Sequence, residues 1–172
     1  MQDGESLFEG RRFRVVRLRE LMPDGSEHVR EVVRHPGAVA VLPLLNDGRV
    51  CLVRNYRAAV DEVLLELPAG TLEPGEDPAE TARRELAEET GYRAGRIDPL
   101  ASFYMSPGIL DERMHLFAAR SLVAGPTALE AGEQIEPVLV TWEDALAMTS
   151  DGRIHDAKTL VGLLYYARLK PP

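Results

Sequence analysis

Polar and apolar residues alternate along the first part of the chain, from Phe8 to Arg34. An alternation with a period of two is typical of β-strands that bury one face. Pro23, Asp24 and Gly25 interrupt the pattern with residues that favour tight turns. The pattern predicts a β-hairpin or a small sheet, and because such a piece is only marginally stable alone, it needs a surface to pack against.

The remainder of the chain mixes short apolar runs with longer helical patterns. Asp77 can cap a helix, Pro78 suits its first position, and Gly91 offers its end. This order of elements predicts an α+β sandwich with a small β region in front of it. The predicted strands are residues 38–45, 49–54, 63–67, 100–105, 113–120 and 137–141, and the predicted helices are 78–90, 142–148 and 156–170.

Length and charge narrow the class of protein. A chain of 172 residues is long enough for one ordinary domain with a full core. Its formal net charge of −8 makes nucleic acid a poor partner, and no apolar run approaches the roughly 20 residues that a membrane helix needs. The first 14 residues contain three acids and no apolar core, so they do not resemble a signal peptide, and Cys51 is the only cysteine. We therefore expect a cytoplasmic protein that binds neither nucleic acid nor membrane.

Three glutamates of the first predicted helix carry the strongest chemical pattern. Glu85, Glu88 and Glu89 fall on one face, because residues three and four apart are neighbours on a helix. Carboxylates this close repel one another unless something neutralises them, and oxygen ligands of this kind suit Mg²⁺. The alternative is a solvated acidic face, which is the usual meaning of a charge run.

The residues around these glutamates resemble the Nudix box without a departure. The matching positions are Gly70, Glu76, Arg84-Glu85-Leu86, Glu88-Glu89 and Gly91-Tyr92. The resemblance implies the Nudix α/β/α sandwich with a mixed sheet, and a site for Mg²⁺ or Mn²⁺ that positions a diphosphate. It implies that the metal ligands are Glu85, Glu88, Glu89 and the carbonyl of Ala69, with Arg84 and Glu76 orienting them.

The segment after the box resembles the ADP-ribose pyrophosphatase subgroup of the family. This segment runs from residue 102 to 112 and contains Ser106, Pro107 and Glu112. The alternative is an ordinary strand end with Pro-Gly turn chemistry. The resemblance implies hydrolysis of ADP-ribose to AMP and ribose 5-phosphate, and it marks these three residues as candidate substrate contacts.

An arginine pair upstream of the box also resembles this subgroup. Arg54 and Arg57 are suited to phosphate oxygens, which guanidinium groups bind in a fork. Glu66, in the corner that leads to Gly70, joins them as a candidate substrate contact. The alternative is that both arginines are surface residues paired with Asp61 or Glu62.

Both ends of the chain resemble the same subgroup, although the likeness is weaker before residue 38. Members of the subgroup are homodimers whose N-terminal strands help to wall the adenosine site of the partner. We therefore divide the chain into a β region, residues 1–36, for dimerisation and the substrate wall, and a Nudix hydrolase domain, residues 37–172. The polar hairpin, which needs a packing surface, independently favours a dimer.

The attacking water needs a base, and the acidic loop before the last predicted strand is the candidate region. Glu133 is our first choice for the base or for a further metal ligand, by resemblance to the family. The family often has a second acid where this chain has Ala131, so a shifted Glu130 stays open as the base. An exposed acidic loop is the ordinary alternative.

Two other functions stay open at this point. One is a broader pyrophosphatase that acts on nucleoside diphosphate sugars. The other is a Nudix-fold module that senses a nucleotide without cleaving it, although the intact acidic helix argues against that.

Overall fold

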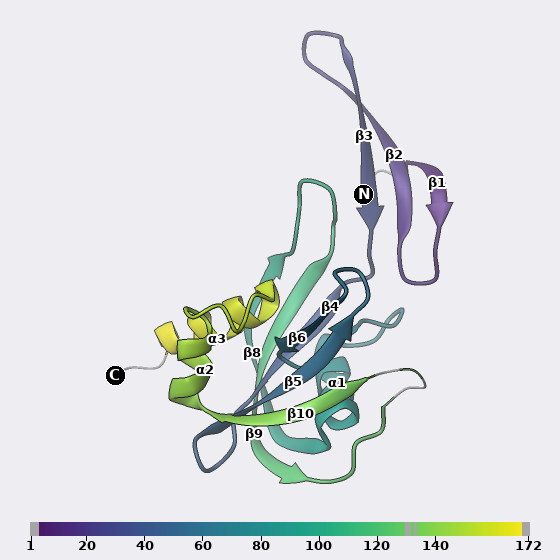
Figure 1. Ribbon diagram of the computed structural model, residues 1–172. Helices are drawn as coiled ribbons and strands as arrows, with labels where there is room; N and C mark the ends of the chain where they lie inside the picture. Colours follow the sequence, from purple (N-terminus) through teal and green to yellow (C-terminus); the bar gives the residue numbers. More distant parts are fainter. Residues whose placement is uncertain (1–3, 130–131, 133, 170–172) are drawn as a thin grey trace.

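The computed structural model describes residues 4–129, 132 and 134–169 (Figure 1). Its strands are β1 (Glu5–Glu9), β2 (Arg14–Leu21), β3 (Glu27–Arg34), β4 (Ala38–Pro43), β5 (Arg49–Arg57), β6 (Glu62–Glu66), β7 (Ala69–Thr71), β8 (Tyr92–Tyr104), β9 (Arg113–Ala124) and β10 (Ile135–Thr141). Its helices are α1 (Pro78–Thr90), α2 (Trp142–Met148) and α3 (Ala157–Leu169).

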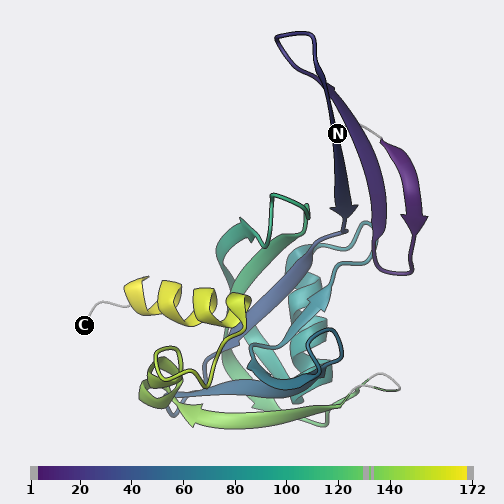
Figure 2. The same cartoon turned by 45° about the horizontal axis from the view of Figure 1, so that its top comes forward.

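Helices cover the sheets of the body from both sides, with α1 on one side and α2 and α3 on the other (Figures 1 and 2). Strand β4 shows how the two layers are built, because its side chains alternate between two cores. Ala40 and Leu42 pack with residues of α2 and α3, whereas Val39 and Val41 pack with Ala82 and Leu86 of α1. The predicted α/β/α sandwich is confirmed.

The sheets of the body are mixed, as predicted. One has the strand order β7-β4-β9-β8, with β4 and β9 parallel and the other neighbours antiparallel, and the second has the order β10-β5-β6. Strand β8 begins at Tyr92, well before the predicted start at Leu100, because it pairs with β9 as far as Ala124. A register shift between Pro99 and Ala101 lets the ladder pass the proline.

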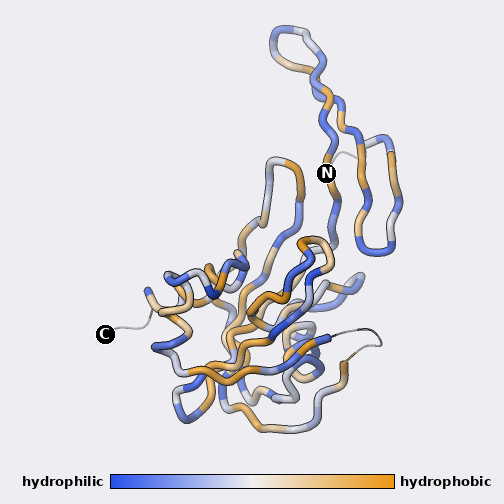
Figure 3. Tube along the Cα trace, in the orientation of Figure 1, coloured by the Kyte–Doolittle hydropathy of each residue, from blue (hydrophilic) through white to orange (hydrophobic). Residues whose placement is uncertain are grey.

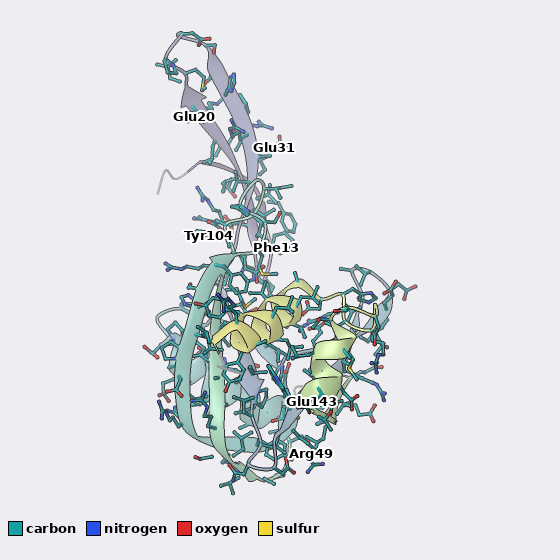
Figure 4. All side chains as sticks on the ribbon, turned by 90° about the vertical axis from the view of Figure 1, so that its left-hand side faces the viewer. Phe13, Glu20, Glu31, Arg49, Tyr104 and Glu143 are labelled. Carbon is teal, nitrogen blue, oxygen red and sulfur yellow. The ribbon has the colours of Figure 1, made fainter. Side chains whose placement is uncertain are left out.

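Strands β1, β2 and β3 form a separate antiparallel sheet that projects from the body (Figure 1). Blue and orange segments alternate along it in Figure 3, as the sequence pattern predicted. Figure 4 places Glu20 and Glu31 on this projection, and Arg49 and Glu143 at the far end of the body. The sheet joins the body at Arg34, which pairs with Asp111 at 2.9 Å, and through a bridge between Val33 and Leu110.

None of the helices in the described ranges is both long and apolar enough to cross a membrane.

Candidate active site

Helix α1 presents its acidic face to a cleft because its apolar face is buried. Ala82 and Leu86 are fully buried against the sheet. The ends of the helix are fixed as the sequence predicts: the Asp77 carboxylate accepts a hydrogen bond from the Ala79 N–H at 2.8 Å, and Gly91 takes a left-handed conformation with φ 74°. Gly91 also lies against the Gly125 carbonyl, where a Cβ atom would stand only 2.3 Å away.

Arg84 joins three carboxylates of the box. Its Nε and Nη2 atoms donate to the two oxygens of Glu76 at 3.2 and 3.1 Å. Its Nη1 atom donates to Glu85 at 2.7 Å and to Glu88 at 3.1 Å. The hydrogen bond with Glu76 raises the pKa of Arg84 above its ordinary value, and the same bond lowers the pKa of Glu76. The expectation that Arg84 orients the acids fits this geometry.

The corner between β6 and β7 brings the peptide backbone up to two of the glutamates. Glu89 is buried, and its Oε2 accepts a hydrogen bond from the Ala69 N–H at 3.1 Å. A Cβ atom at Gly70 would lie 2.0 Å from the Glu85 carboxylate, so only glycine leaves room for that side chain. Ala69, Glu85 and Glu89 are therefore brought together from segments that are 15 or more residues apart.

The donor set suits a hard divalent cation. It consists of carboxylate oxygens with a neighbouring backbone carbonyl, and Mg²⁺ takes oxygen ligands of both kinds. Among residues 4–129, 132 and 134–169, no three His, Cys, Asp or Glu side chains are gathered into one ligand set as they stand. Arg84 supplies the positive charge that Glu85 and Glu88 face in this arrangement.

The acidic face of α1 forms one wall of an open cleft of about 670 Å³. Arg57 and Lys158 line the same cleft, as do Asn55 of β5 and Glu112 of the segment before β9. Arg11 and Arg12, on the turn between β1 and β2, complete its lining on the side of the projecting sheet. The cleft thus combines acids that suit a cation with cationic groups that suit phosphate oxygens.

The two predicted arginines differ in their surroundings. Arg57 lines the cleft and holds Glu66 in a fork, with Nε–Oε1 at 2.7 Å and Nη2–Oε2 at 2.5 Å. Arg54 is exposed, lies outside the cleft lining and pairs with Glu136 at 3.3 Å. The alternative partners, Asp61 and Glu62, are engaged elsewhere, Asp61 with the Tyr56 hydroxyl and Glu62 with His155.

The predicted residues after the box are spread around the cleft rather than gathered in it. Ser106 and Pro107 are exposed in the connection between β8 and β9, outside the cleft lining. The Ser106 carbonyl accepts hydrogen bonds from the amides of Ile109 and Leu110. Glu112 does line the cleft, 3.7 Å from His35. The candidate bases Glu130 and Glu133 lie outside the described residues.

Among the cleft residues that the sequence analysis missed as site residues are Arg11, Arg12, Asp156 and Lys158. Asp156 and Lys158 stand at the start of α3, and Lys158 contacts Glu66 of β6, which lies 92 residues earlier in the chain. The local sequence indicates only the capping role of Asp156 in this arrangement. Asp156 accepts the Thr159 N–H at 3.0 Å, which is ordinary N-capping that a sequence can indicate.

Comparisons with known proteins agree with this geometry. The sequence model of the NUDIX domain family matches residues 34–160. The chain is 42% identical over 146 residues to the ADP-ribose pyrophosphatase of Bacillus subtilis (strain 168), covering 84% of this chain and 79% of that protein. It is 41% identical over 166 residues to the methanol dehydrogenase activator of Bacillus methanolicus, covering 94% and 88%.

A third relative and a solved structure are also similar to this chain. The GDP-mannose pyrophosphatase of Yersinia enterocolitica is 38% identical over 153 residues, covering 83% of this chain and 79% of that protein. A crystal structure of an ADP compounds hydrolase superposes with a TM-score of 0.84 at 23% identity, covering 96% of this chain and 90% of that one, and it supports the fold.

The fold and the acidic helix define a hydrolase with a cation-compatible site. The chain belongs to the NUDIX family, and it is a Nudix hydrolase. Hydrolases of this family generally use divalent metal cations. The sequence prediction of family, fold and enzyme class is confirmed.

Proposed function

We propose that this enzyme hydrolyses the diphosphate bond of ADP-ribose to AMP and ribose 5-phosphate in the presence of Mg²⁺. The observation that carries the proposal is the cleft, in which the carboxylates of α1 face Arg57 and Lys158 across one open space. A diphosphate needs both kinds of group, because cations neutralise its oxygens while fixed donors orient them.

The relatives support this substrate class. The ADP-ribose pyrophosphatase of Bacillus subtilis, which is 42% identical to this chain, is named for the activity that we propose. The GDP-mannose pyrophosphatases favour the alternative of a broader enzyme for nucleoside diphosphate sugars. Both activities break a diphosphate bond, so the alternatives differ in the groups on either side of it.

In the proposed mechanism, the residues of the chain bind, orient and activate. Glu85, Glu88, Glu89 and the Ala69 carbonyl would hold Mg²⁺, with Mn²⁺ as a possible substitute, and the ion would neutralise charge on the diphosphate. Arg84 keeps Glu85 and Glu88 in place, and Arg57 binds a phosphate oxygen. A base takes a proton from water, and Glu133 or Glu130 is proposed for that role. Water oxygen bonds to one phosphorus as the bond from that phosphorus to the bridging oxygen breaks.

Hydrolysis of ADP-ribose in oxygen-18 water with Mg²⁺ tests this proposal. We expect AMP and ribose 5-phosphate in equal amounts, with the label in only one of the two phosphates. Chelation of the metal should abolish the reaction. Bound ADP-ribose without products would instead favour the nucleotide-sensing alternative.

A panel of nucleoside diphosphate sugars compared by kcat/KM separates the two enzyme alternatives. The proposal predicts that ADP-ribose exceeds GDP-mannose by at least about tenfold, a preference worth about 1.4 kcal/mol in the transition state. Similar values for both substrates would favour the broader pyrophosphatase.

We propose in addition that the protein is a homodimer formed through the projecting sheet. Leu7, Phe8, Leu21 and Val29 of this sheet are 40% to 77% exposed, and buried apolar contacts stabilise dimers. Leu21→Asp should shift the dimer to monomer in sedimentation experiments, whereas Leu164→Asp on α3 should not.

Two other expectations from the sequence stay predictions. One is that the substrate contacts include Ser106, Pro107, Glu112 and Arg54, and the other is a cytoplasmic location.

A further inference from the structure

Glu66 is the most deeply buried acid near the cleft, and it is surrounded by cations rather than by solvent. Only 1% of this residue is exposed. Its Oε1 accepts from the Arg57 Nε at 2.7 Å, and its Oε2 accepts from both Arg57 Nη2 and Lys158 Nζ at 2.5 Å. Burial alone would raise the pKa of Glu66, but the hydrogen bond from Arg57 and the charge of Lys158 outweigh it and lower the pKa. Glu66 is therefore a charged anchor with little surface left for a substrate.

Lys158 holds this anchor from the other side. Its ammonium also donates to Asp156 at 3.0 Å, and its side chain is only 9% exposed. Asp156 in turn accepts from the Thr159 hydroxyl at 2.5 Å, and that hydroxyl accepts from the Leu67 N–H at 2.8 Å. The start of α3 and the end of β6 are thus tied together at two neighbouring points.

The guanidinium of Arg57 is oriented by this arrangement. Two of its three nitrogens are bound to Glu66, while Nη1 makes no hydrogen bond with any described residue. The Arg57 side chain is 40% exposed and lines the cleft, in contrast to the buried Glu66. A fork of two charge-assisted hydrogen bonds restricts rotation of the guanidinium, so the remaining donors keep one direction.

We propose that Lys158 is a positioning residue for substrate binding, acting through Glu66 to hold the Arg57 guanidinium ready for a phosphate oxygen. Glu66 belongs to the same positioning unit and does not itself contact the substrate. This inference rests on the proposed diphosphate substrate. Without the ammonium, the Glu66 carboxylate is free to turn, and the two-point fork to Arg57 loses its alignment.

A double-mutant cycle tests the coupling that the proposal requires. The variants are Lys158→Met, Arg57→Met and the double variant, each measured for kcat and KM with ADP-ribose and Mg²⁺. Lys158→Met should raise KM about tenfold with kcat within about twofold, because a contact present in both the ground state and the transition state acts on KM. The double variant should resemble Arg57→Met within about twofold, since residues that act through one another are not additive.

Arg120→Met is the matched control. Arg120 also forms a partly buried network, with Asp98 at 3.0 Å and the Tyr166 hydroxyl at 3.0 Å, but it lies outside the cleft lining. We expect its loss to leave KM unchanged in both the native and the Arg57→Met backgrounds. Lys158→Arg, which keeps the charge and the donors, should recover most of the lost affinity.

The other outcomes are equally informative. Effects of Lys158→Met and Arg57→Met that multiply in the double variant would overturn the proposal in favour of an independent substrate contact. An unchanged KM with a lower melting temperature would reduce Lys158 to a purely structural role. If Lys158→Met does not fold, Lys158→Gln enters the same cycle, because it retains a donor for Glu66.

The failure of the proposed substrate is a separate result. If the native enzyme does not cleave ADP-ribose, the proposed function fails, and the cycle is run with whichever nucleoside diphosphate sugar it cleaves. The predicted coupling between Lys158 and Arg57 is the same for any diphosphate.

Discussion

The body of the enzyme and its projecting N-terminal sheet differ in how far their charged and apolar side chains are buried. In the body, charged groups such as Glu66, Glu89 and Lys158 are buried and held by polar partners, and the apolar side chains of the core are buried as well. In the N-terminal sheet, Val16 is the only buried apolar side chain among the described residues, and the ion pairs lie at the surface. Burial of charge therefore marks the part of the molecule in which we place the chemistry.

The difference matters energetically because solvent weakens ion pairs. An exposed pair contributes at most about 1 kcal/mol, whereas removing one partner of a buried pair costs about 3–5 kcal/mol. Substitutions in the cleft should therefore have large and specific effects, and similar substitutions in the N-terminal sheet should have small ones.

Glu89→Gln should give the largest effect. It replaces a buried carboxylate, which accepts the Ala69 N–H, with a neutral group of the same size. We expect kcat to fall about a thousandfold or more, as for other groups that stabilise charge in a transition state, while circular dichroism stays native. Glu80→Gln is the matched control on the same helix, where Glu80 is exposed and pairs with Arg83 at 3.5 Å. Equal activity of the two variants would contradict the assignment.

Gly70→Ala comes next. Its Cβ would stand 2.0 Å from the Glu85 carboxylate, so the side chain or the corner has to move. We expect kcat/KM to fall about a hundredfold, because small displacements of catalytic groups are costly. Gly108→Ala is the control, since a Cβ there meets nothing within 4 Å. Native kinetics of Gly70→Ala would show that Glu85 needs no fixed place.

Glu76→Gln should change the pH dependence of stability by a smaller amount. Arg84 lowers the pKa of Glu76 below its ordinary value of 4.5. The pair therefore stabilises the native state above that value, and this contribution is lost as the pH falls through the lowered pKa. Denaturant unfolding should show a difference from the native protein of up to about 1 kcal/mol at pH 7 that disappears once the pH falls below the lowered pKa of Glu76. A difference that stays constant over this range would exclude the ion pair as its source.

Arg17→Met in the N-terminal sheet should have the smallest effect. Arg17 pairs with Glu5 at 3.5 Å and with Glu31 at 3.2 Å, and all three side chains are substantially exposed. We expect a loss of less than about 1 kcal/mol in unfolding and no change in kcat. A larger loss would mean that this sheet depends on its charges as the cleft does.

The sequence predicted the parts of the fold and site that depend on neighbouring residues. Helix α1 begins after Asp77 and ends before Gly91 as predicted, because its caps are local. The acids and Arg84 share one helix face for the same reason, so their proximity followed from their spacing.

The parts that depend on distant pairing were not predictable in this way. The first half of β8 is a strand because it pairs with residues of β9 more than 20 positions away. The contacts between Lys158 and Glu66 join segments 92 residues apart. Nothing in the local pattern of either segment indicates that a lysine of α3 stands behind an arginine of β5.

Binding of Mn²⁺, followed by electron paramagnetic resonance, tests most directly whether the carboxylates of α1 hold the cation. We predict that the native protein binds Mn²⁺ and that Mg²⁺ displaces it. Glu89→Gln should weaken this binding at least about tenfold, in the range seen when groups at a metal site are changed, and Glu80→Gln should leave it unchanged. Equal binding by Glu89→Gln and the native protein would contradict the account.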